Sequence, residues 1–218
     1  MLTTERHGQV LVATMDDGKA NALSHALIDA LRAVVAEAET DDDVRALVLV
    51  GRVGRFCAGF DLSVMNEGPA AQARLVAAGG DLIRTMYAVG VPVVAACTGH
   101  ALAAGALLLL GCDRRVGVDA PVKIGLNEVA IGLALPGWAI ALAAARLAPT
   151  HLQASAATGQ LYDGAGAVAA GYLDRIVPPE TVVAEAIAEA QSLVTVDPTA
   201  YASVIRSLRS TTLEQMAP

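Results

Sequence analysis

The hydrophobic positions of this chain repeat with two periods that alternate along the sequence. Residues 2–6 and 9–15 are separated by a short polar break, and the second run ends in an Asp-Asp-Gly turn at 16–18, which predicts an antiparallel hairpin. After Ser24, a suitable N-cap, apolar residues recur at helical spacing until Asp41. The apolar run 44–50 then predicts a strand. A strand, a helix and a strand joined by short links form a βαβ unit with a parallel strand pair.

The same alternation continues to the C-terminus. The pattern predicts one α/β core over residues 1–195, followed by a short helical tail over residues 196–218. The expected helices cover residues 72–89, 102–110, 167–171 (ended by a glycine), 178–194 and 198–209, and the expected strands cover residues 91–96, 114–118 and 174–177.

One stretch is long enough to raise the question of a membrane span. Residues 86–112 contain no Asp, Glu, Lys or Arg. However, Pro92 and the Thr-Gly-His sequence at 98–100 interrupt the run, and its pieces fit a short buried strand and a short buried helix. Strands that are covered on both faces have continuous apolar runs of this kind. We therefore expect no membrane association.

Composition and charge exclude several classes of function. Of the 218 residues, 55% are hydrophobic and 17% are charged, which excludes a disordered chain. The net charge is −7 and only 3% of residues are aromatic, so we expect no nucleic-acid partner. The three cysteines, Cys57, Cys97 and Cys112, are far apart and form no CxxC pair. We expect neither a disulfide framework nor a metal site, and the absence of a secretory signal favours a cytoplasmic location.

Two glycine-containing turns, residues 51–62 and 98–105, each follow a predicted strand and lead toward a helix. In open α/β sheets, ligands bind at this carboxyl edge. Two backbone N–H groups that converge there would form an oxyanion hole, which stabilises a carbonyl as it becomes an enolate. The alternative is that the small residues only allow a helix to pack tightly on a strand. Neither turn matches a dinucleotide-binding or P-loop motif.

Glu128 is the third feature with possible chemistry. It is the only charged residue between Lys123 and Arg146. A carboxyl group in apolar surroundings has a raised pKa, which suits proton transfer near neutral pH. The alternative is a carboxylate that faces solvent or is satisfied by backbone donors.

Five segments together resemble the crotonase (enoyl-CoA hydratase/isomerase) superfamily. They are Asn-Ala-Leu-Ser at 21–24, Phe-Cys-Ala-Gly-Phe-Asp-Leu at 56–62, the glycine turn and helix at 99–113, Ser-Ala-Ala-Thr-Gly at 155–159 and Ala-Gly-Tyr-Leu at 170–173. The resemblance implies an α/β, crotonase-like spiral of ββα units, here with a shortened helical C-terminal part. It also implies an acyl-CoA substrate, no cofactor apart from the coenzyme A of that substrate, and a homo-trimer or hexamer.

The resemblance also assigns residues. The two oxyanion-hole N–H groups fall on Phe60 and Ala104, where the family usually has glycine, with Gly105 as the alternative donor. Ala58, Gly59, Asp61, Gly105 and Leu107 are expected to contact the substrate.

The two glutamates of the family's hydratases distinguish the possible reactions. The second matches Glu128, but the first falls on Leu107. A single base suffices to move a proton from C2 to C4 of a 3-enoyl chain, so the chain is most similar to the Δ3,Δ2-enoyl-CoA isomerase branch. The alternatives are a hydratase or another enolate reaction, an acyl-CoA-binding pseudoenzyme, and a purely structural trimer.

Five residues have simpler interpretations. Asp61 is expected to cap a helix, His100 to be packed with one tautomer fixed, and Cys57 to fill the core. Arg52 and Arg55 are candidates for contacts with the phosphates of coenzyme A, or for solvated loop residues.

Overall fold

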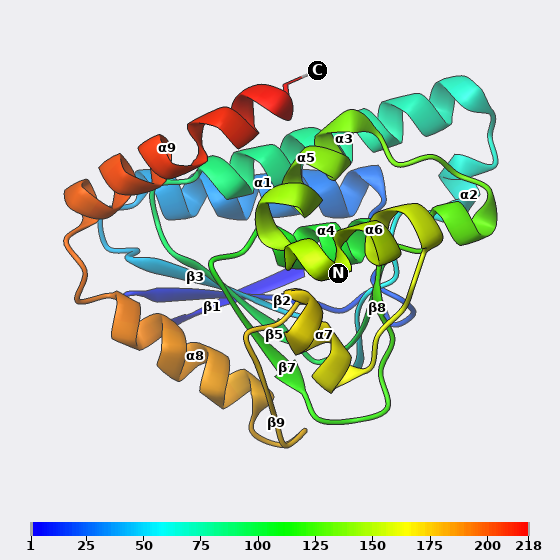
Figure 1. Cartoon of the computed structure of the whole chain (residues 1–218). Helices are drawn as coiled ribbons and strands as arrows, with labels where there is room; N and C mark the ends of the chain where they lie inside the picture. Colours follow the sequence, from blue (N-terminus) through cyan, green and yellow to red (C-terminus); the bar gives the residue numbers. More distant parts are fainter. Residues whose placement is uncertain (1, 218) are drawn as a thin grey trace.

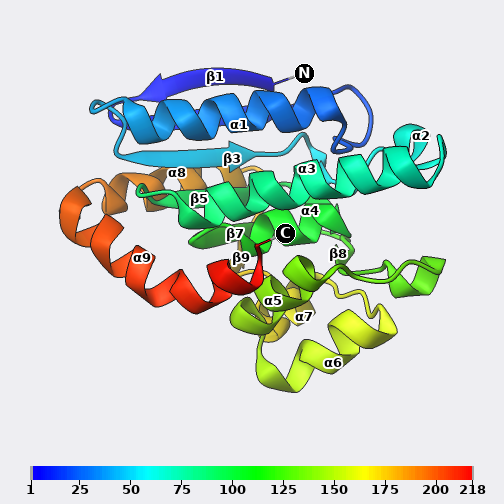
Figure 2. The same cartoon turned by 90° about the horizontal axis from the view of Figure 1, so that it is seen from above.

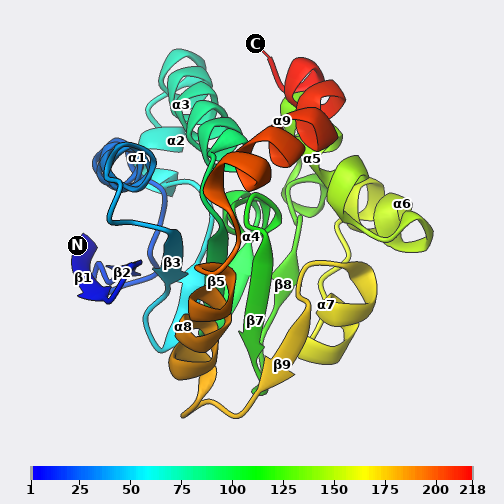
Figure 3. The same ribbon diagram turned by 90° about the vertical axis from the view of Figure 1, so that its left-hand side faces the viewer.

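The computed structural model describes residues 2–217, which fold around two β-sheets (Figure 1). Helix α8 (Val182–Leu193) covers one face of the larger sheet, and the other helices lie on the opposite face or beside the smaller sheet (Figure 3). Parallel strands need a helix or a second layer on each face, and in this arrangement both faces of the larger sheet are covered.

Within residues 2–217 the larger sheet has six strands in the order β1-β2-β3-β5-β7-β9. The β1–β2 pair is antiparallel, and all the other pairs are parallel. The strands are β1 (Leu2–His7), β2 (Val10–Met15), β3 (Ala46–Val50), β5 (Val93–Cys97), β7 (Arg114–Val118) and β9 (Arg175–Val177).

The smaller sheet has three strands in the same described range, all parallel, in the order β4-β6-β8. They are β4 (Gly54–Cys57), β6 (Gly99–Leu102) and β8 (Ile124–Gly125). Strands β3, β5 and β7 of the larger sheet are each followed by a strand of the smaller sheet and then by helical segments. This winding confirms the predicted crotonase-like spiral of ββα units.

The long helices α1 and α3 lie side by side across the molecule, and α5, α6 and α7 form a group beside β8 (Figure 2). The helices besides α8 are α1 (His25–Thr40), α2 (Leu62–Met65), α3 (Pro69–Ala88), α4 (Ala104–Leu110), α5 (Gly137–Arg146), α6 (Pro149–Thr158), α7 (Gly164–Ala170) and α9 (Pro198–Gln215), together with the 3-10 turn η1 (Val129–Ile131).

Local sequence signals account for many of these boundaries. Ser24 accepts a hydrogen bond from the Leu27 N–H and begins α1, and Asp41 ends it. Gly171 ends α7 in the left-handed conformation, as its glycine predicts. The N-terminal hairpin, β7 and the short strand at β9 are confirmed as well.

Four expectations need correction. The helix expected over residues 178–194 begins at Val182 rather than at the two prolines. The two glycine turns are not loops throughout, because each contains a strand of the smaller sheet, β4 or β6. The helix expected from residue 102 begins at Ala104, since Leu102 still pairs with β8. The last helix continues to Gln215 rather than ending near Arg209.

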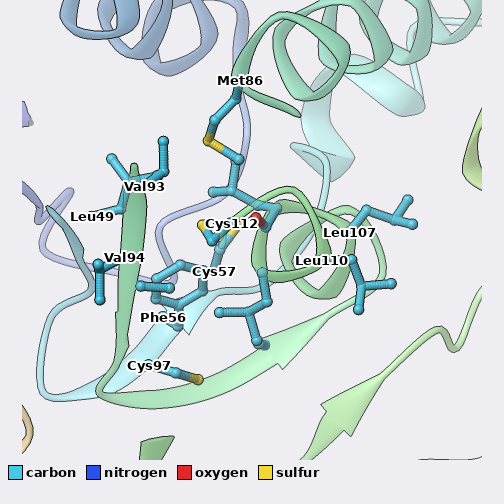
Figure 4. Packing of buried hydrophobic residues seen from close by; sticks show 14 of the residues in the cluster. Leu49, Phe56, Cys57, Met86, Val93, Val94, Cys97, Leu107, Leu110 and Cys112 are labelled. Atoms are coloured by element: carbon cyan, nitrogen blue, oxygen red, sulfur yellow. Dashed lines mark hydrogen bonds between the residues drawn. The ribbon is translucent and has the colours of Figure 1, made fainter. Parts of the chain in front are cut away.

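The charge-free stretch 86–112 forms the centre of the core, as β5, β6 and α4. Figure 4 shows Leu107 and Leu110 of α4 in the same buried hydrophobic cluster as Phe56, Cys57 and Cys97. Within residues 2–217, no helix combines the length and apolar character needed to cross a membrane. In the same range no three His, Cys, Asp or Glu residues are grouped in a way that could hold a metal ion.

Candidate active site

A cavity of about 630 Å³ lies between α3, the start of α4, α5 and the segment that follows β8. This volume is typical of a small-molecule site. Four of the predicted site residues line it: Ala58, Phe60, Leu107 and Glu128. The other lining residues are Leu62, Met65, Pro69, Gln72, Ala73, Val76, Ala103, Asn127, Ile131, Leu133, Ala134, Leu135, Pro136 and Trp138.

The backbone around Glu128 is fixed on both sides. Upstream, the Gly125 carbonyl accepts a hydrogen bond of 3.0 Å from the Ala103 N–H, which ties β8 to the start of α4. Downstream, the Glu128 carbonyl accepts hydrogen bonds from the N–H groups of Ile131 (3.0 Å) and Leu133 (2.9 Å). The Glu128 side chain is therefore carried by an ordered turn rather than by a free loop.

The Glu128 carboxyl group is in surroundings that disfavour its charge. Its Oε2 atom is enclosed and has no hydrogen-bond partner among residues 2–217. Burial raises the pKa of the Glu128 carboxyl above its usual value. Among the lining residues that the structure describes, Glu128 is the only one with an ionisable side chain. A base that is poised by desolvation and has no charged neighbour in the pocket is suited to taking up and returning one proton.

The first glycine turn is held against Leu23. The Leu23 N–H donates to the Gly59 carbonyl (2.8 Å), and the Leu23 carbonyl accepts from the Asp61 N–H (3.1 Å). In such a parallel bridge, the N–H of the intervening residue, Phe60, is directed away from Leu23.

The second glycine turn places a strained residue directly before α4. Ala103 has φ +51° and ψ −123°, a conformation that L residues rarely adopt. Ala104 is the first residue of α4, where a helix cannot supply an acceptor for the N–H. A Cβ atom added at Gly59 would lie 3.0 Å from the Ala103 Cβ and 3.6 Å from the Ala104 nitrogen. The two turns are therefore in contact, and glycine at position 59 allows it.

Leu107 is on the first turn of α4 and is only 1% exposed. It lines the same cavity as Glu128, so the position at which the family's hydratases have a glutamate is apolar in this pocket. Gly105 has a different surrounding: an added Cβ atom would lie 2.1 Å from the Cys57 carbonyl oxygen. Gly105 thus allows α4 to approach β4 closely, and it does not line the cavity.

The side chain of Asp61 faces away from this cavity. It caps α2, with Oδ1 accepting hydrogen bonds from the Ser63 N–H (2.9 Å) and hydroxyl (2.7 Å), which confirms the interpretation as a helix cap. Asp61 and Ser63 line a second, larger cavity of about 1010 Å³, whereas Phe60 and Leu62 line the first. The turn at 60–63 therefore separates the two cavities.

The remaining candidates are engaged locally. His100 Nδ1 accepts a hydrogen bond from the Lys123 N–H (2.8 Å), which fixes its tautomer as expected, and partial burial lowers its pKa. Arg52 forms an ion pair with Asp16 (3.3 Å), and Arg55 donates to the Gly54 carbonyl (2.8 Å). Cys57 is fully buried, and burial raises the pKa of its thiol to about 12.

Sequence reasoning missed three notable residues of the pocket: Gln72, Asn127 and Trp138. Asn127 Oδ1 is enclosed and has no hydrogen-bond partner among residues 2–217. For Asn127, its position next to Glu128 was an available signal. For Gln72 the sequence indicated only that residues 68–78 affect the depth of the pocket, without placing any of them. For Trp138 there was no signal, because its place in the pocket depends on how α3 and α5 pack.

Comparison with known proteins agrees with this geometry. The family model described as enoyl-CoA hydratase/isomerase matches residues 5–217. The chain belongs to the enoyl-CoA hydratase/isomerase family. This assignment fits the arrangement of the two glycine turns and Glu128 around a single cavity.

Similar proteins carry both names of the family. The chain is 34% identical over 172 residues to a probable enoyl-CoA hydratase of Mycobacterium avium, which covers 78% of this chain and 66% of that protein. It thus spans slightly less than two thirds of that relative. It is 33% identical over 205 residues to a putative enoyl-CoA hydratase of Thermus thermophilus, covering 91% of this chain and 79% of that protein.

Solved structures are similar over almost the whole chain. A Mycobacterium tuberculosis protein is named an enoyl-CoA isomerase in one structure and a probable enoyl-CoA hydratase in another. The first structure is 35% identical with a TM-score of 0.94, covering 99% of this chain and 93% of that chain. The second is 36% identical with a TM-score of 0.94, covering 99% of this chain and 91% of that chain. The human mitochondrial Δ3-Δ2-enoyl-CoA isomerase is 27% identical with a TM-score of 0.93, covering 98% of this chain and 85% of that chain.

Proposed function

We propose that the chain is an acyl-CoA enzyme that moves the double bond of a 3-enoyl-CoA to position 2, with Glu128 as its base. The observation that carries the proposal is the pairing of Glu128 with Leu107 in one cavity that has no second carboxylate among its described lining residues. A hydratase needs a second acid to orient and activate water. A proton shift needs one group that removes the proton and returns it.

In the proposed mechanism, the N–H groups of Phe60 and Ala104 polarise the thioester oxygen. Glu128, in its carboxylate form, takes a proton from C2, and the electrons of that C–H bond move into the thioester to give a dienolate. The two N–H groups stabilise the negative charge as it develops on oxygen. The protonated Glu128 then delivers the proton to C4, which leaves the double bond between C2 and C3. The apolar lining of the pocket keeps water from competing for the intermediate.

The substrate-binding roles of Ala58, Gly59, Asp61, Gly105 and Leu107 belong to the same proposal. Ala58 and Leu107 would contact the acyl group, while Gly59 and Gly105 would act through the backbone that they allow to approach. Asp61 would contact a part of the substrate that lies in the neighbouring cavity. We further propose that Arg52 and Arg55 reach the phosphates of coenzyme A only after giving up their present local partners.

The test is an assay with 3-hexenoyl-CoA that follows the conjugated product. Wild type should turn over, and Glu128→Gln should lose roughly 10²- to 10⁴-fold in kcat. Glu180→Gln removes the same charge at an exposed position and is the matched control. Absence of turnover by wild type, or full activity of Glu128→Gln, would refute the proposal.

Hydration is the second candidate, because several relatives are named as probable enoyl-CoA hydratases. Hydration of crotonyl-CoA at a rate that exceeds isomerisation would favour it. Tight binding of acyl-CoA without deuterium exchange at C2 would instead indicate a binding protein that has lost the chemistry.

A further inference from the structure

The wall that α3 contributes to the cavity ends abruptly. Gln72 and Val76 both line the cavity, and residues four apart lie on the same face of a helix. The next position on this face is Gly80, which does not line the cavity. The cavity thus extends along α3 past Gln72 and Val76 and ends before Gly80.

The indole of Trp138 covers Gly80. A Cβ atom added at Gly80 would lie 2.8 Å from both Cε2 and Nε1 of Trp138. The neighbouring Gly79 is covered in the same way by Phe60, whose Cε1 atom would lie 2.3 Å from an added Cβ. The two aromatic rings therefore rest directly on the backbone of α3. Trp138 cannot retreat toward α3 when a ligand presses on its other side.

Trp138 forms a half-buried part of the cavity wall. It is partly buried and packed against the core, at the start of α5, which contacts α4. Leu62 and Ile131, by contrast, are 64% and 57% exposed and form part of the outer rim. Trp138 is less exposed than this rim, so an acyl chain that enters at the rim can reach the indole inside it.

We propose that Trp138, backed by Gly80, sets the depth of the cavity and thereby the length of the acyl chain that this protein accepts. The inference rests on the proposed function, because it assumes that the cavity holds the acyl group of a thioester. Each methylene that enters the pocket and leaves water tightens binding about fourfold. That gain stops at the chain length whose terminal methyl group reaches the indole.

The experiment measures binding of saturated acyl-CoA esters, from butyryl to hexadecanoyl in steps of two carbons, by calorimetry. Wild type should show affinity that rises with chain length and then reaches a limit. Trp138→Leu should move the limit to longer chains by at least two carbons, with roughly a tenfold or greater gain for the first chain beyond it. Gly80→Ala pushes the indole into the cavity and should move the limit to shorter chains.

The single tryptophan of the chain gives a direct second readout in the unmodified protein. Esters at the limiting length should change its fluorescence, while shorter esters should leave it nearly unchanged. Ile140→Ala, on the same helix but half exposed, is the matched control and should leave the limit in place. Circular dichroism checks that each variant is folded.

Opposite shifts of the limit in the two variants would support the inference. The same limit in wild type and Trp138→Leu, or a loss of affinity that is equal for all chain lengths, would overturn it. Saturated esters are not isomerised, so the result is independent of turnover. A shifted limit without any conversion of 3-hexenoyl-CoA would refute the proposed reaction alone, whereas no binding of any ester would refute both.

Discussion

Glu128 has a partly buried carboxyl group with an enclosed Oε2 atom, and its ionisation is therefore linked to the stability of the fold. Because burial raises its pKa, the folded chain holds this proton more tightly than the unfolded chain does. Stability should fall as pH rises from the ordinary glutamate value of 4.5 through the raised value. The loss is about 1.4 kcal/mol for each unit by which the pKa is raised.

Glu128→Gln should remove this loss. Chemical unfolding of wild type and variant at several pH values between 4 and 8 should show a difference that grows with pH in favour of the variant. The exposed substitution Glu180→Gln should show no such growth. A constant difference between wild type and Glu128→Gln over this range would contradict the assignment of a desolvated carboxyl group.

Leu107 offers a second test at the same scale. Leu107→Glu places a carboxyl group in the cavity that already holds Glu128, and like charges disfavour each other's ionisation. The acidic limb of the pH–rate profile for isomerisation should move to higher pH, and the ratio of hydration to isomerisation should rise. Leu107→Gln has a similar size without the charge, and its acidic limb should stay near that of wild type. Coincident limbs for the Glu and Gln variants would show that residues 107 and 128 do not interact.

The close approach of helix α4 to strand β4 depends on one glycine. A Cβ atom at Gly105 would lie 2.1 Å from the Cys57 carbonyl oxygen, so the backbone itself would have to shift. Gly105→Ala should destabilise the fold by about 1–3 kcal/mol and displace the start of α4. Gly137, at the start of α5, has open space where its Cβ would lie, and Gly137→Ala should be neutral or stabilising by up to about 1 kcal/mol. Equal stabilities for the two variants in urea would contradict this packing.

Elements with a long periodic pattern were predictable, and those with a short one were not. The stripe of α1 and the apolar runs of β3, β5 and β7 gave correct types and nearly correct bounds. Strands β4, β6 and β8 have four residues or fewer and lie within glycine-containing segments, so no period could develop. Their strand character comes from pairing with segments that are remote in the sequence.

The same reason limits what the sequence shows of the site. The sequence motifs predicted that Phe60, Leu107 and Glu128 belong to one site, and the structure places all three around one cavity. The wall formed by Gln72 and Trp138 could not be anticipated, because it arises where α3 meets α5. Residue identity thus indicated the chemistry, while helix packing determines the shape in which the substrate must fit.

In the whole molecule, the spiral winding of the chain brings segments that are far apart in the sequence close together in space. Each turn adds one strand to the smaller sheet, and the segments that follow these strands meet at one edge. The cavity is bounded by α3 and α5 on the side away from this edge, and α9 contacts both of these helices (Figure 1). The C-terminal helix therefore supports the two walls from outside.

A buried ion pair attaches α9 to the rest of the fold. Arg209 is 4% exposed, donates to Asp113 and to the Tyr87 carbonyl (2.7 Å), and lies 4.3 Å from the centre of the Tyr87 ring. Asp113 in turn accepts a hydrogen bond from the Val93 N–H (2.7 Å), so the pair connects α9 to the start of β5. Removing one partner of such a pair leaves a buried charge without compensation.

Arg209→Ala should therefore lower the free energy of unfolding by about 3–5 kcal/mol, with a fall in Tm on the order of 10 °C. Arg206→Ala, at an exposed position of the same helix, should change it by less than about 0.5 kcal/mol. Combining Arg209→Met with Asp113→Asn removes both charges and should recover part of the loss, because neither partner is then left charged. Thermal unfolding followed by circular dichroism measures all three, and an Arg209→Ala variant as stable as Arg206→Ala would show that α9 is held by its apolar contacts alone.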